Sequence, residues 1–368
     1  MTKNEKIRKR FSGGHPDVLS GRLHGRAGQS MSSEVSTSAP TKESVTIVDS
    51  SGTELEFQKN CRRIVCVWPS GTQLLVTLGM GDLLIGVSDD SKEQSWAVEM
   101  YPRLQEIPSC SNEEAAESIL NLDADVVLTT EADVAADWRS KGIPAVTFSY
   151  YSVDEMKQTI STLAEIVPDE YAQKCQKYLD YLEDRMESVK TALQGKVQEK
   201  ETLYYIHGNN NKGLYKTAGG GTMNEAWAEA ADVNFATSDL LTSSETVVDA
   251  EAILAKDPSI IVIGGRYQHR LAEELRNTEE WKNIRAVKES RIYTVPYGIS
   301  PFDRFGAEFA LMIPWTASVA YPEYYSFDIN KAVKDFYQEF TDYTLTDEQV
   351  SYIVNGLAPN GKEDIPDA

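Results

Sequence analysis

A thirteen-residue pattern that occurs twice constrains the fold of this chain more than any other feature. The segment AESILNLDADVVL at 116–128 returns without a gap as AEAILAKDPSIIV at 250–262, an offset of 134 residues (250 − 116). In each copy, helically spaced apolar residues give way to a continuous apolar run. This is typical of a short helix, a tight turn and a strand buried on both faces. Because the period is too long for a solenoid repeat, the pattern predicts two similar α/β lobes, each with one carboxylate (Glu117 or Glu251) at the same place.

A long amphipathic helix is predicted between the two copies. Strand signals are missing from 149 to 200, and from Tyr171 to Leu193 apolar residues recur three or four positions apart. About 28 helical residues at ~1.5 Å each would extend ~42 Å, far beyond an ordinary crossover helix. We interpret this helix as a strut that joins the lobes. A coiled coil is the competing interpretation, but the apolar stripe ends after about four heptads.

These features predict the α/β fold class, with two lobes built on mostly parallel sheets and joined by one long helix. The expected parts are an N-terminal tail at 1–43, an N-terminal lobe at 44–151, a linker region at 152–200, a C-terminal lobe at 201–327, and helices at 328–368 that pack on the lobes. Residues 1–43 are expected to be a disordered tether because they contain little that could build a core. Basic residues at positions 3–10 resemble the start of an export signal, but neither an apolar run of 7–15 residues nor a lipid-attachment cysteine follows them.

Charge and composition exclude several classes of function. A net charge of −21 argues against a nucleic-acid partner, which needs clustered Lys and Arg. The four cysteines lack a CxxC pair, so a zinc or iron–sulfur site is not expected, and Cys66 and Cys175 fall on apolar faces as core thiols. The glycines at 219–221 precede a helix, yet they lack the spacing of a P-loop or a dinucleotide fingerprint.

Aromatic and charged residues gather after the predicted strands. Ligands of open α/β sheets bind outside the carboxyl ends of the strands, so these residues are candidates for a binding site. They are Trp68, Tyr150 and Tyr151 in the first half, and Tyr215, Lys216, Tyr267, Tyr297, Phe302, Asp303 and Arg304 in the second half. Single loop aromatics are commonly plain surface residues, but their shared position favours a cleft for a bulky or π-rich ligand with some negative charge.

Glu117 and Glu251 have two interpretations. Carboxylates early in a helix favour the helix dipole, which needs no function. An acid/base pair would have to converge to ~5–9 Å, which carboxylates on separate lobes do not do. Two matched carboxylates far apart suit docking onto a two-fold symmetric partner that offers two basic sites.

The order and spacing of these segments resemble the iron–siderophore and cobalamin substrate-binding proteins of ABC importers. The likeness covers residue 44 to the end of the chain. It is carried by VTIVD at 45–49, RIV at 63–65, LG at 78–79, GVS at 86–88, both copies of the repeat, PFDR at 301–304 and YPE at 321–323. The resemblance implies two Rossmann-like lobes, one bridging helix, little hinge motion and a ligand held between the lobes. Gln73 stands where many members of the family have Glu.

The resemblance also implies roles for individual residues. The family's paired surface glutamates dock on arginines of the two permease subunits, and they correspond to Glu117 and Glu251. The expected ligand-binding residues are Trp68, Trp96, Tyr101, Tyr215, Lys216, Arg266, Tyr267, Tyr297, Phe302, Asp303 and Arg304. Among them Lys216, Arg266 and Arg304 would offset ligand charge.

The resulting hypothesis is a monomeric, non-enzymatic receptor that captures a ferric siderophore or a similar metal chelate and delivers it to an ABC permease dimer. It has no expected cofactor, metal ligands or catalytic residues of its own, and it would work outside the cytoplasm in association with a membrane. A corrinoid or haem is the alternative ligand. The competing classes are a nitrogenase-like or cofactor-assembly enzyme, which would need clustered cysteines at a lobe interface, and a pure interaction module.

Overall fold

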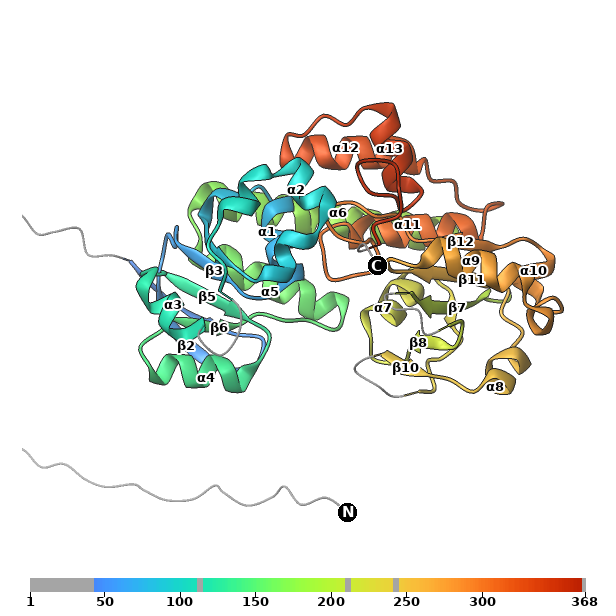
Figure 1. Ribbon diagram of the computed structural model, residues 1–368, viewed down its shortest axis with the longest axis horizontal. Coiled ribbons are helices and arrows are strands. Elements are labelled where there is room, and N and C mark those ends of the chain that lie inside the picture. The colour runs from blue at the N-terminus through green and yellow to red at the C-terminus, as the bar shows by residue number, and fades with distance from the viewer. Residues whose placement is uncertain (1–42, 111–114, 209–212, 241–244, 366–368) are drawn as a thin grey trace, which may run out of the picture. The chain divides into compact units, whose positions relative to one another are not determined.

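The computed structural model describes residues 43–110, 115–208, 213–240 and 245–365 (Figure 1). The tail expected at 1–43 lies outside these ranges, apart from its last residue. Lys42–Ala368 forms one compact unit. No helix within the described ranges is both long and apolar enough to cross a membrane.

The N-terminal half is built on a four-stranded parallel sheet in the order β4–β3–β5–β6. Its strands are β3 (Ile64–Cys66), β4 (Leu84–Val87), β5 (Val126–Thr129) and β6 (Ala145–Thr147). An antiparallel hairpin of β1 (Ser44–Val48) and β2 (Glu54–Gln58) precedes the sheet. Around the sheet lie α1 (Pro69–Thr77), η1 (Gly81–Leu83), η2 (Asp89–Glu93), α2 (Ser95–Met100), η3 (Pro102–Glu106), α3 (Ala115–Asn121) and α4 (Ala132–Ser140).

The C-terminal half has a second four-stranded parallel sheet, in the order β12–β11–β7–β9. Its strands are β7 (Thr202–His207), β9 (Asn234–Phe235), β11 (Ile260–Gly264) and β12 (Ile292–Thr294). A small antiparallel pair, β8 (Lys216–Ala218) with β10 (Glu245–Val247), was not predicted. The helices are α7 (Met223–Ala230), α8 (Ala250–Ala255), α9 (Gln268–Asn277), η4 (Glu279–Trp281) and α10 (Arg285–Lys288).

Both copies of the repeat form a helix, a turn and a buried strand, as predicted. The first copy is α3 and β5, and the second is α8 and β11 (Figure 1). The equivalence extends to the backbone of the turn, because Asp123 and Asp257 occupy the same place in the two copies and have φ values of 48° and 42°. Aspartate tolerates this left-handed conformation better than most residues, which explains why each turn carries one.

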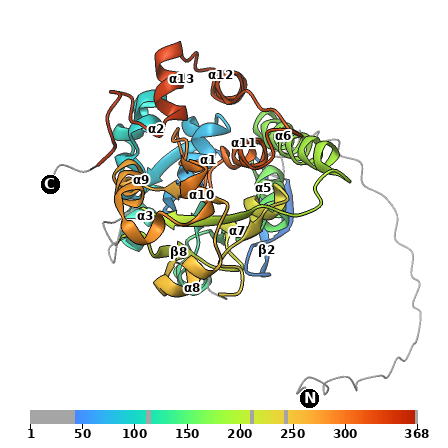
Figure 2. The same cartoon turned by 90° about the vertical axis from the view of Figure 1, so that its right-hand side faces the viewer.

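The linker consists of α5 (Val153–Ile166) and the long helix α6 (Asp169–Leu193). At 25 residues, α6 is about 37 Å long, slightly shorter than the sequence suggests. The predicted apolar stripe is buried at Cys175, Tyr178, Leu182, Val189 and Leu193. Helix α6 packs against α5 and against α11 (Phe309–Ala320), which lies beside it in Figure 2. The Tyr178 hydroxyl donates to the carbonyl oxygen of Ala307 at 3.0 Å, which ties the linker to the C-terminal half.

The helices predicted at 328–368 are α12 (Ile329–Thr341) and α13 (Asp347–Val354), and Thr346 with Gln349 forms a capping box at the start of α13. Helix α12 packs against α1, α11 and α13. One apolar cluster of buried residues extends from the first sheet through α6, α11 and α12 to one face of the second sheet. All four cysteine side chains are buried, so the expectation of core thiols is confirmed for Cys66 and Cys175.

Candidate functional site

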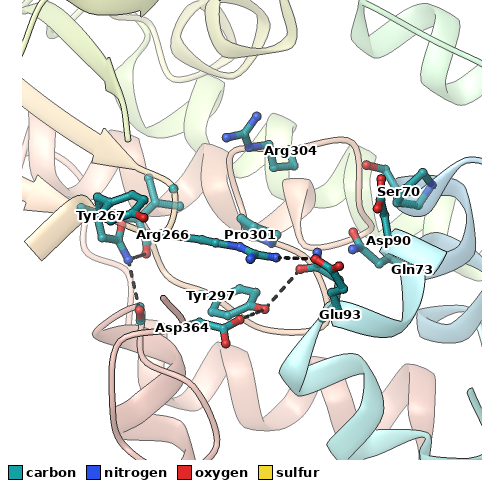
Figure 3. Close-up of a pocket in the computed structure, with 16 residues that line it drawn as sticks. Ser70, Gln73, Asp90, Glu93, Arg266, Tyr267, Tyr297, Pro301, Arg304 and Asp364 are labelled. Carbon is teal, nitrogen blue, oxygen red and sulfur yellow. Dashed lines mark hydrogen bonds and ion pairs between the residues drawn. The ribbon is translucent and has the colours of Figure 1, made fainter. Parts of the chain in front are cut away.

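A pocket of about 470 Å³ lies between the two halves (Figure 3). The N-terminal half contributes Pro69, Ser70, Gln73, Asp90, Glu93 and Gln94. The C-terminal half contributes Gly265, Arg266, Tyr267, Gln268, Val295, Tyr297, Pro301 and Arg304. Two further residues, Gly356 and Asp364, come from the segment that follows α13.

The pocket lies at the carboxyl ends of strands from both sheets. Pro69 starts α1 after β3, Gly265 follows β11 directly, and Val295 follows β12 directly. Ligands of parallel α/β sheets bind at these ends, because the loops there converge and helices begin there. Proline suits the first turn of α1, where a backbone N–H would have no intrahelical partner. The carboxyl ends of strands from both sheets therefore lie next to one cavity.

Arg304 is the best supported cation of the pocket. Its Nε lies 3.6 Å from Oδ1 of Asp303, a fully buried carboxylate that also accepts a hydrogen bond from the Tyr205 hydroxyl. Burial opposes the charge of the guanidinium, but Tyr205, Asp303 and Glu245 hold the Arg304 pKa above its ordinary value. Its Nη2 is buried without a hydrogen-bond partner among the described residues. Arg304 is therefore charged and retains donors for an anion.

Gly264, at the end of β11, makes room for this arrangement. A Cβ atom there would overlap the carboxylate of Asp303 and the hydroxyl of Tyr205. The strand end can therefore approach the buried acid only because glycine has no side chain.

Arg266 is held more loosely. Its Nη2 lies 3.4 Å from Oε2 of Glu93, across the boundary between the halves, and the two side chains are 29% and 61% exposed. An exposed ion pair of this kind contributes little free energy and exchanges readily. An incoming anion can therefore replace Glu93 as the partner of Arg266.

Tyr297 is a buried residue that lines the pocket and contacts two polar side chains of its wall. Its hydroxyl lies 2.7 Å from Oδ2 of Asp364 and 3.2 Å from Oε1 of Gln94. Burial and the charge of Asp364 raise the pKa of Tyr297, so the hydroxyl stays protonated and donates to the carboxylate. Figure 3 shows this contact, with Arg266 reaching across the pocket to Glu93 and Arg304 on the far side from Asp364.

Of the residues that the sequence proposes for ligand binding, the structure brings Arg266, Tyr267, Tyr297 and Arg304 together in the pocket wall. The others do not line this pocket, and a contact of theirs with ligand stays a prediction. They are Trp68, Trp96, Tyr101, Tyr215, Lys216, Phe302 and Asp303.

Several of these side chains have partners of their own. Trp68 packs against Tyr150 and Phe305, with ring centroids 5.4 and 5.8 Å apart. Trp96 is fully buried and donates from Nε1 to the carbonyl oxygen of Leu357 at 2.8 Å. Phe302 is also fully buried.

The two predicted tyrosines outside the pocket are likewise bonded. The Tyr101 hydroxyl donates to Oδ1 of Asp82 at 2.8 Å, and the Tyr215 hydroxyl bonds to Glu280 and receives a hydrogen bond from Trp281 Nε1 at 3.1 Å. Tyr101 therefore hydrogen-bonds within the N-terminal half, and Tyr215 hydrogen-bonds within the C-terminal half.

Lys216 belongs to a charge cluster inside the C-terminal half. It is buried and forms an ion pair with Glu245, whose other oxygen, Oε1, lies 2.6 Å from Nε2 of His207. Burial, followed by the charges of Arg304 and Lys216, lowers the pKa of His207 to about 2. The imidazole is therefore neutral and donates its Nε2–H to Glu245. The charge of Lys216 is balanced within this cluster.

Sequence reasoning missed the acidic side of the pocket. Asp90, Glu93 and Gln94 follow β4 in the same way that the predicted residues follow their strands, so the strand-end rule could have found them. No sequence pattern around Asp364 marks it as a pocket residue. It lines the pocket because the chain after α13 folds back to this cavity.

Glu117 and Glu251 do not line the pocket, and they lie in the first turns of α3 and α8. Both side chains are exposed, and neither forms an ion pair within the described ranges. In the same ranges, no three His, Cys, Asp or Glu side chains are grouped so that they could hold a metal ion.

Comparison with known families gives a match over most of this architecture. A family described as "Periplasmic binding protein" matches residues 64–297. An uncharacterised ABC transporter substrate-binding lipoprotein of Bacillus subtilis, YvrC, is 26% identical over 264 residues, which cover 68% of this chain and 78% of the relative.

Two further proteins are similar. A cobalamin-binding protein of Halobacterium salinarum is 27% identical over 225 residues, and the match spans 60% of this chain and 58% of that protein. The crystal structure of a periplasmic solute binding protein from Veillonella parvula superposes with a TM-score of 0.71 at 25% identity, covering 86% of this chain and 99% of that one.

Proposed function

This chain belongs to the periplasmic binding protein family, and we propose that it is the receptor of an ABC importer that captures a ferric siderophore or a similar anionic metal chelate. The chelate binds in the pocket between the two halves and is handed to a membrane permease. The similarity to a substrate-binding lipoprotein supports a place outside the cytoplasm, in association with the membrane.

The observation that carries this proposal is the state of Arg304. Arg304 lines the pocket with a side chain that is 22% exposed, and its Nη2 has no hydrogen-bond partner among the described residues, so the guanidinium retains hydrogen-bonding capacity for an anionic ligand group. The loosely held Arg266 adds a second cation to the same wall. Carboxylate, catecholate and hydroxamate oxygens of an iron chelate are suitable acceptors for both residues.

A corrinoid is the second candidate, and the similarity to the cobalamin-binding protein of Halobacterium salinarum favours it. Two features favour the smaller chelate instead. A pocket of about 470 Å³ is in the range for drug-sized ligands, which a corrinoid exceeds. Among the described residues, two aromatic side chains line it, Tyr267 and Tyr297, whereas a large flat macrocycle calls for broader apolar walls.

The test is a titration of the protein with ferric trihydroxamate, tricatecholate and citrate chelates, with cobalamin and with haem, followed by tryptophan fluorescence. Trp68 immediately precedes the pocket residue Pro69, so a bound iron chelate is expected to quench fluorescence saturably. Saturation by cobalamin alone would replace the proposal by the second candidate. The absence of any saturable response would overturn both.

We also propose that Glu117 and Glu251 dock on basic residues of the two permease subunits. Their equivalent positions in two copies of one structural unit, and their exposure, support this role.

A further inference from the structure

The chain after α13 returns to the pocket and forms part of its wall. In this C-terminal segment, residues 355–365, the carbonyl oxygen of Leu357 accepts the hydrogen bond of Trp96. Farther along, Oδ2 of Asp364 accepts from the Tyr297 hydroxyl at 2.7 Å and from the Ser95 hydroxyl at 3.2 Å. The segment is therefore fixed to both halves, and it holds a carboxylate at the pocket (Figure 3).

Asp364 gives the pocket an uneven distribution of charge. Two guanidinium groups, those of Arg266 and Arg304, and three carboxylates, those of Asp90, Glu93 and Asp364, line the same cavity. Arg304 and Asp364 lie on opposite sides of it in Figure 3. Within the described ranges, Oδ1 of Asp364 accepts no hydrogen bond, so this carboxylate, which lines the cavity, retains acceptor capacity.

We propose that Asp364 is a specificity-determining residue, which receives a cationic or N–H-bearing group at the periphery of the chelate while Arg304 and Arg266 receive its anionic groups. The inference rests on the proposed function. It narrows the ligand class to chelates whose charge is divided, with an anionic metal-binding part and a peripheral ammonium or amide donor. A chelate that is anionic all round would place like charge against Asp364 and lose affinity.

The fixed position of Asp364 is what makes it selective. A carboxylate on a mobile tail would turn away from an anionic ligand at little cost. Here Tyr297 and Ser95 hold it from two halves of the protein, and the backbone of the same segment is held by Trp96. A ligand must therefore satisfy the carboxylate or break these contacts.

The experiment compares two ferric chelates that differ in one charge. One is a linear trihydroxamate with a terminal ammonium, and the other is the same chelate with that amine acetylated. Isothermal titration gives the ratio of their affinities for the wild type, Asp364→Asn and Glu363→Gln. Glu363 is the matched control, because it is the adjacent carboxylate and does not line the pocket.

We expect the wild type and Glu363→Gln to prefer the ammonium form by roughly three- to tenfold, and Asp364→Asn to bind both forms about equally. A ferric tricatecholate, anionic on all sides, is expected to bind Asp364→Asn roughly threefold or more tighter than Glu363→Gln. Tyr297→Phe, which removes one anchor of Asp364 without changing charge, is expected to reduce the preference partway.

Affinities that change equally in Asp364→Asn and Glu363→Gln, or in neither, would overturn the role of Asp364 and leave the proposed function standing. Failure of every chelate to bind the wild type would overturn both. Thermal unfolding of each variant checks that the near-isosteric substitutions leave the fold intact.

Discussion

The two arginines of the pocket differ in what balances their charge. Arg304 faces Asp303, which is fully buried and held by Tyr205, whereas Arg266 faces the exposed Glu93. A buried counter-charge cannot turn away to solvent, so Arg304 keeps one geometry in the free and bound protein. Arg266 must give up an existing partner when a ligand arrives.

We therefore expect Arg304→Gln to weaken chelate binding much more than Arg266→Gln. Loss of a charge-assisted hydrogen bond in a desolvated site costs about 1.5–3 kcal/mol, roughly 10- to 100-fold in affinity. Arg266→Gln is expected to cost about two- to fivefold, as for an exposed ion pair. Isothermal titration measures both, with the exposed Arg270→Gln as the control for net charge. Similar losses in all three variants would show that the pocket arginines act only through overall charge.

Glu308 is a buried acid whose state depends on pH. Its Oε1 accepts from the backbone N–H of Ser300 at 3.1 Å and from the Tyr337 hydroxyl at 2.8 Å, while Oε2 is buried without a partner. Burial raises the pKa of Glu308 to about 7, despite the hydrogen bonds to its carboxylate. The folded protein therefore binds a proton more tightly at this site than the unfolded chain, so stability from Glu308 is present below pH 4.5 and is lost as pH rises through 7.

Relative to Glu308→Gln, the wild type is expected to lose stability between about pH 4.5 and pH 7–8. The difference between about 7 and the ordinary 4.5, at about 1.36 kcal/mol per pH unit, corresponds to about 3 kcal/mol. Urea unfolding at pH 5 and pH 8 measures it, and the exposed Glu323→Gln is the control. Equal pH dependence in wild type and Glu308→Gln would contradict a raised pKa.

Single residues also show where sequence reasoning stops. Arg266, Tyr267, Tyr297 and Arg304 could be placed at the pocket because they follow strands whose ends point to one edge. Phe302 follows β12, as Tyr297 does, but its side chain is fully buried. Trp96 donates a hydrogen bond to the backbone of Leu357, which lies far along the chain. An aromatic residue can face a cleft or a core, and only tertiary packing decides between them.

Secondary structure elements were more predictable than side-chain positions, because local patterns dominate them. The repeated helix–turn–strand unit and the long α6 both follow from apolar spacing and turn residues that can be recognised locally in the sequence. The β8–β10 pair was missed because its strands have three residues each and pair across a long loop. Short strands without a periodic pattern carry little local signal.

The helices α3 and α8 allow docking to be separated from binding. The double variant Glu117→Ala with Glu251→Ala is expected to bind the chelate with wild-type affinity, because both carboxylates are exposed and neither lines the pocket. Transport into proteoliposomes that contain the cognate permease is expected to fall to background. The measurement is uptake of a radiolabelled chelate.

A matched control for the docking test replaces two other exposed carboxylates, Asp133→Ala on α4 with Glu274→Ala on α9. It makes the same change in net charge and is expected to transport normally. Loss of chelate binding in the Glu117/Glu251 variant would assign these residues to the fold or the pocket instead of docking.

For the molecule as a whole, the continuity of the core limits motion between the halves. One buried apolar cluster includes residues of both sheets, and the ring of Trp68 from the N-terminal half packs on Phe305 from the C-terminal half. Opening the two halves widely would expose part of this cluster to water, at about 25 cal/mol for each Å² of apolar surface. Closely packed interfaces of this kind favour a fixed arrangement.

We therefore expect ligand binding to change the radius of gyration by less than about 1 Å, the scale of backbone movement in preorganised complexes. Small-angle X-ray scattering of the free and chelate-saturated protein provides the measurement. A contraction of several ångströms would instead indicate hinge closure around the ligand.

The burial of every cysteine side chain has a practical consequence for testing the proposed binding of iron chelates. Burial raises the pKa of Cys66 to about 11 and of Cys175 to about 12, and it raises the pKa of Cys110 as well, so these thiols are poorly reactive at neutral pH. A cysteine introduced at Lys92, between the pocket residues Asp90 and Glu93, would then be the preferred site for a thiol-reactive fluorophore. The protein could thus be converted into an optical sensor by a single substitution, with its native cysteines left in place.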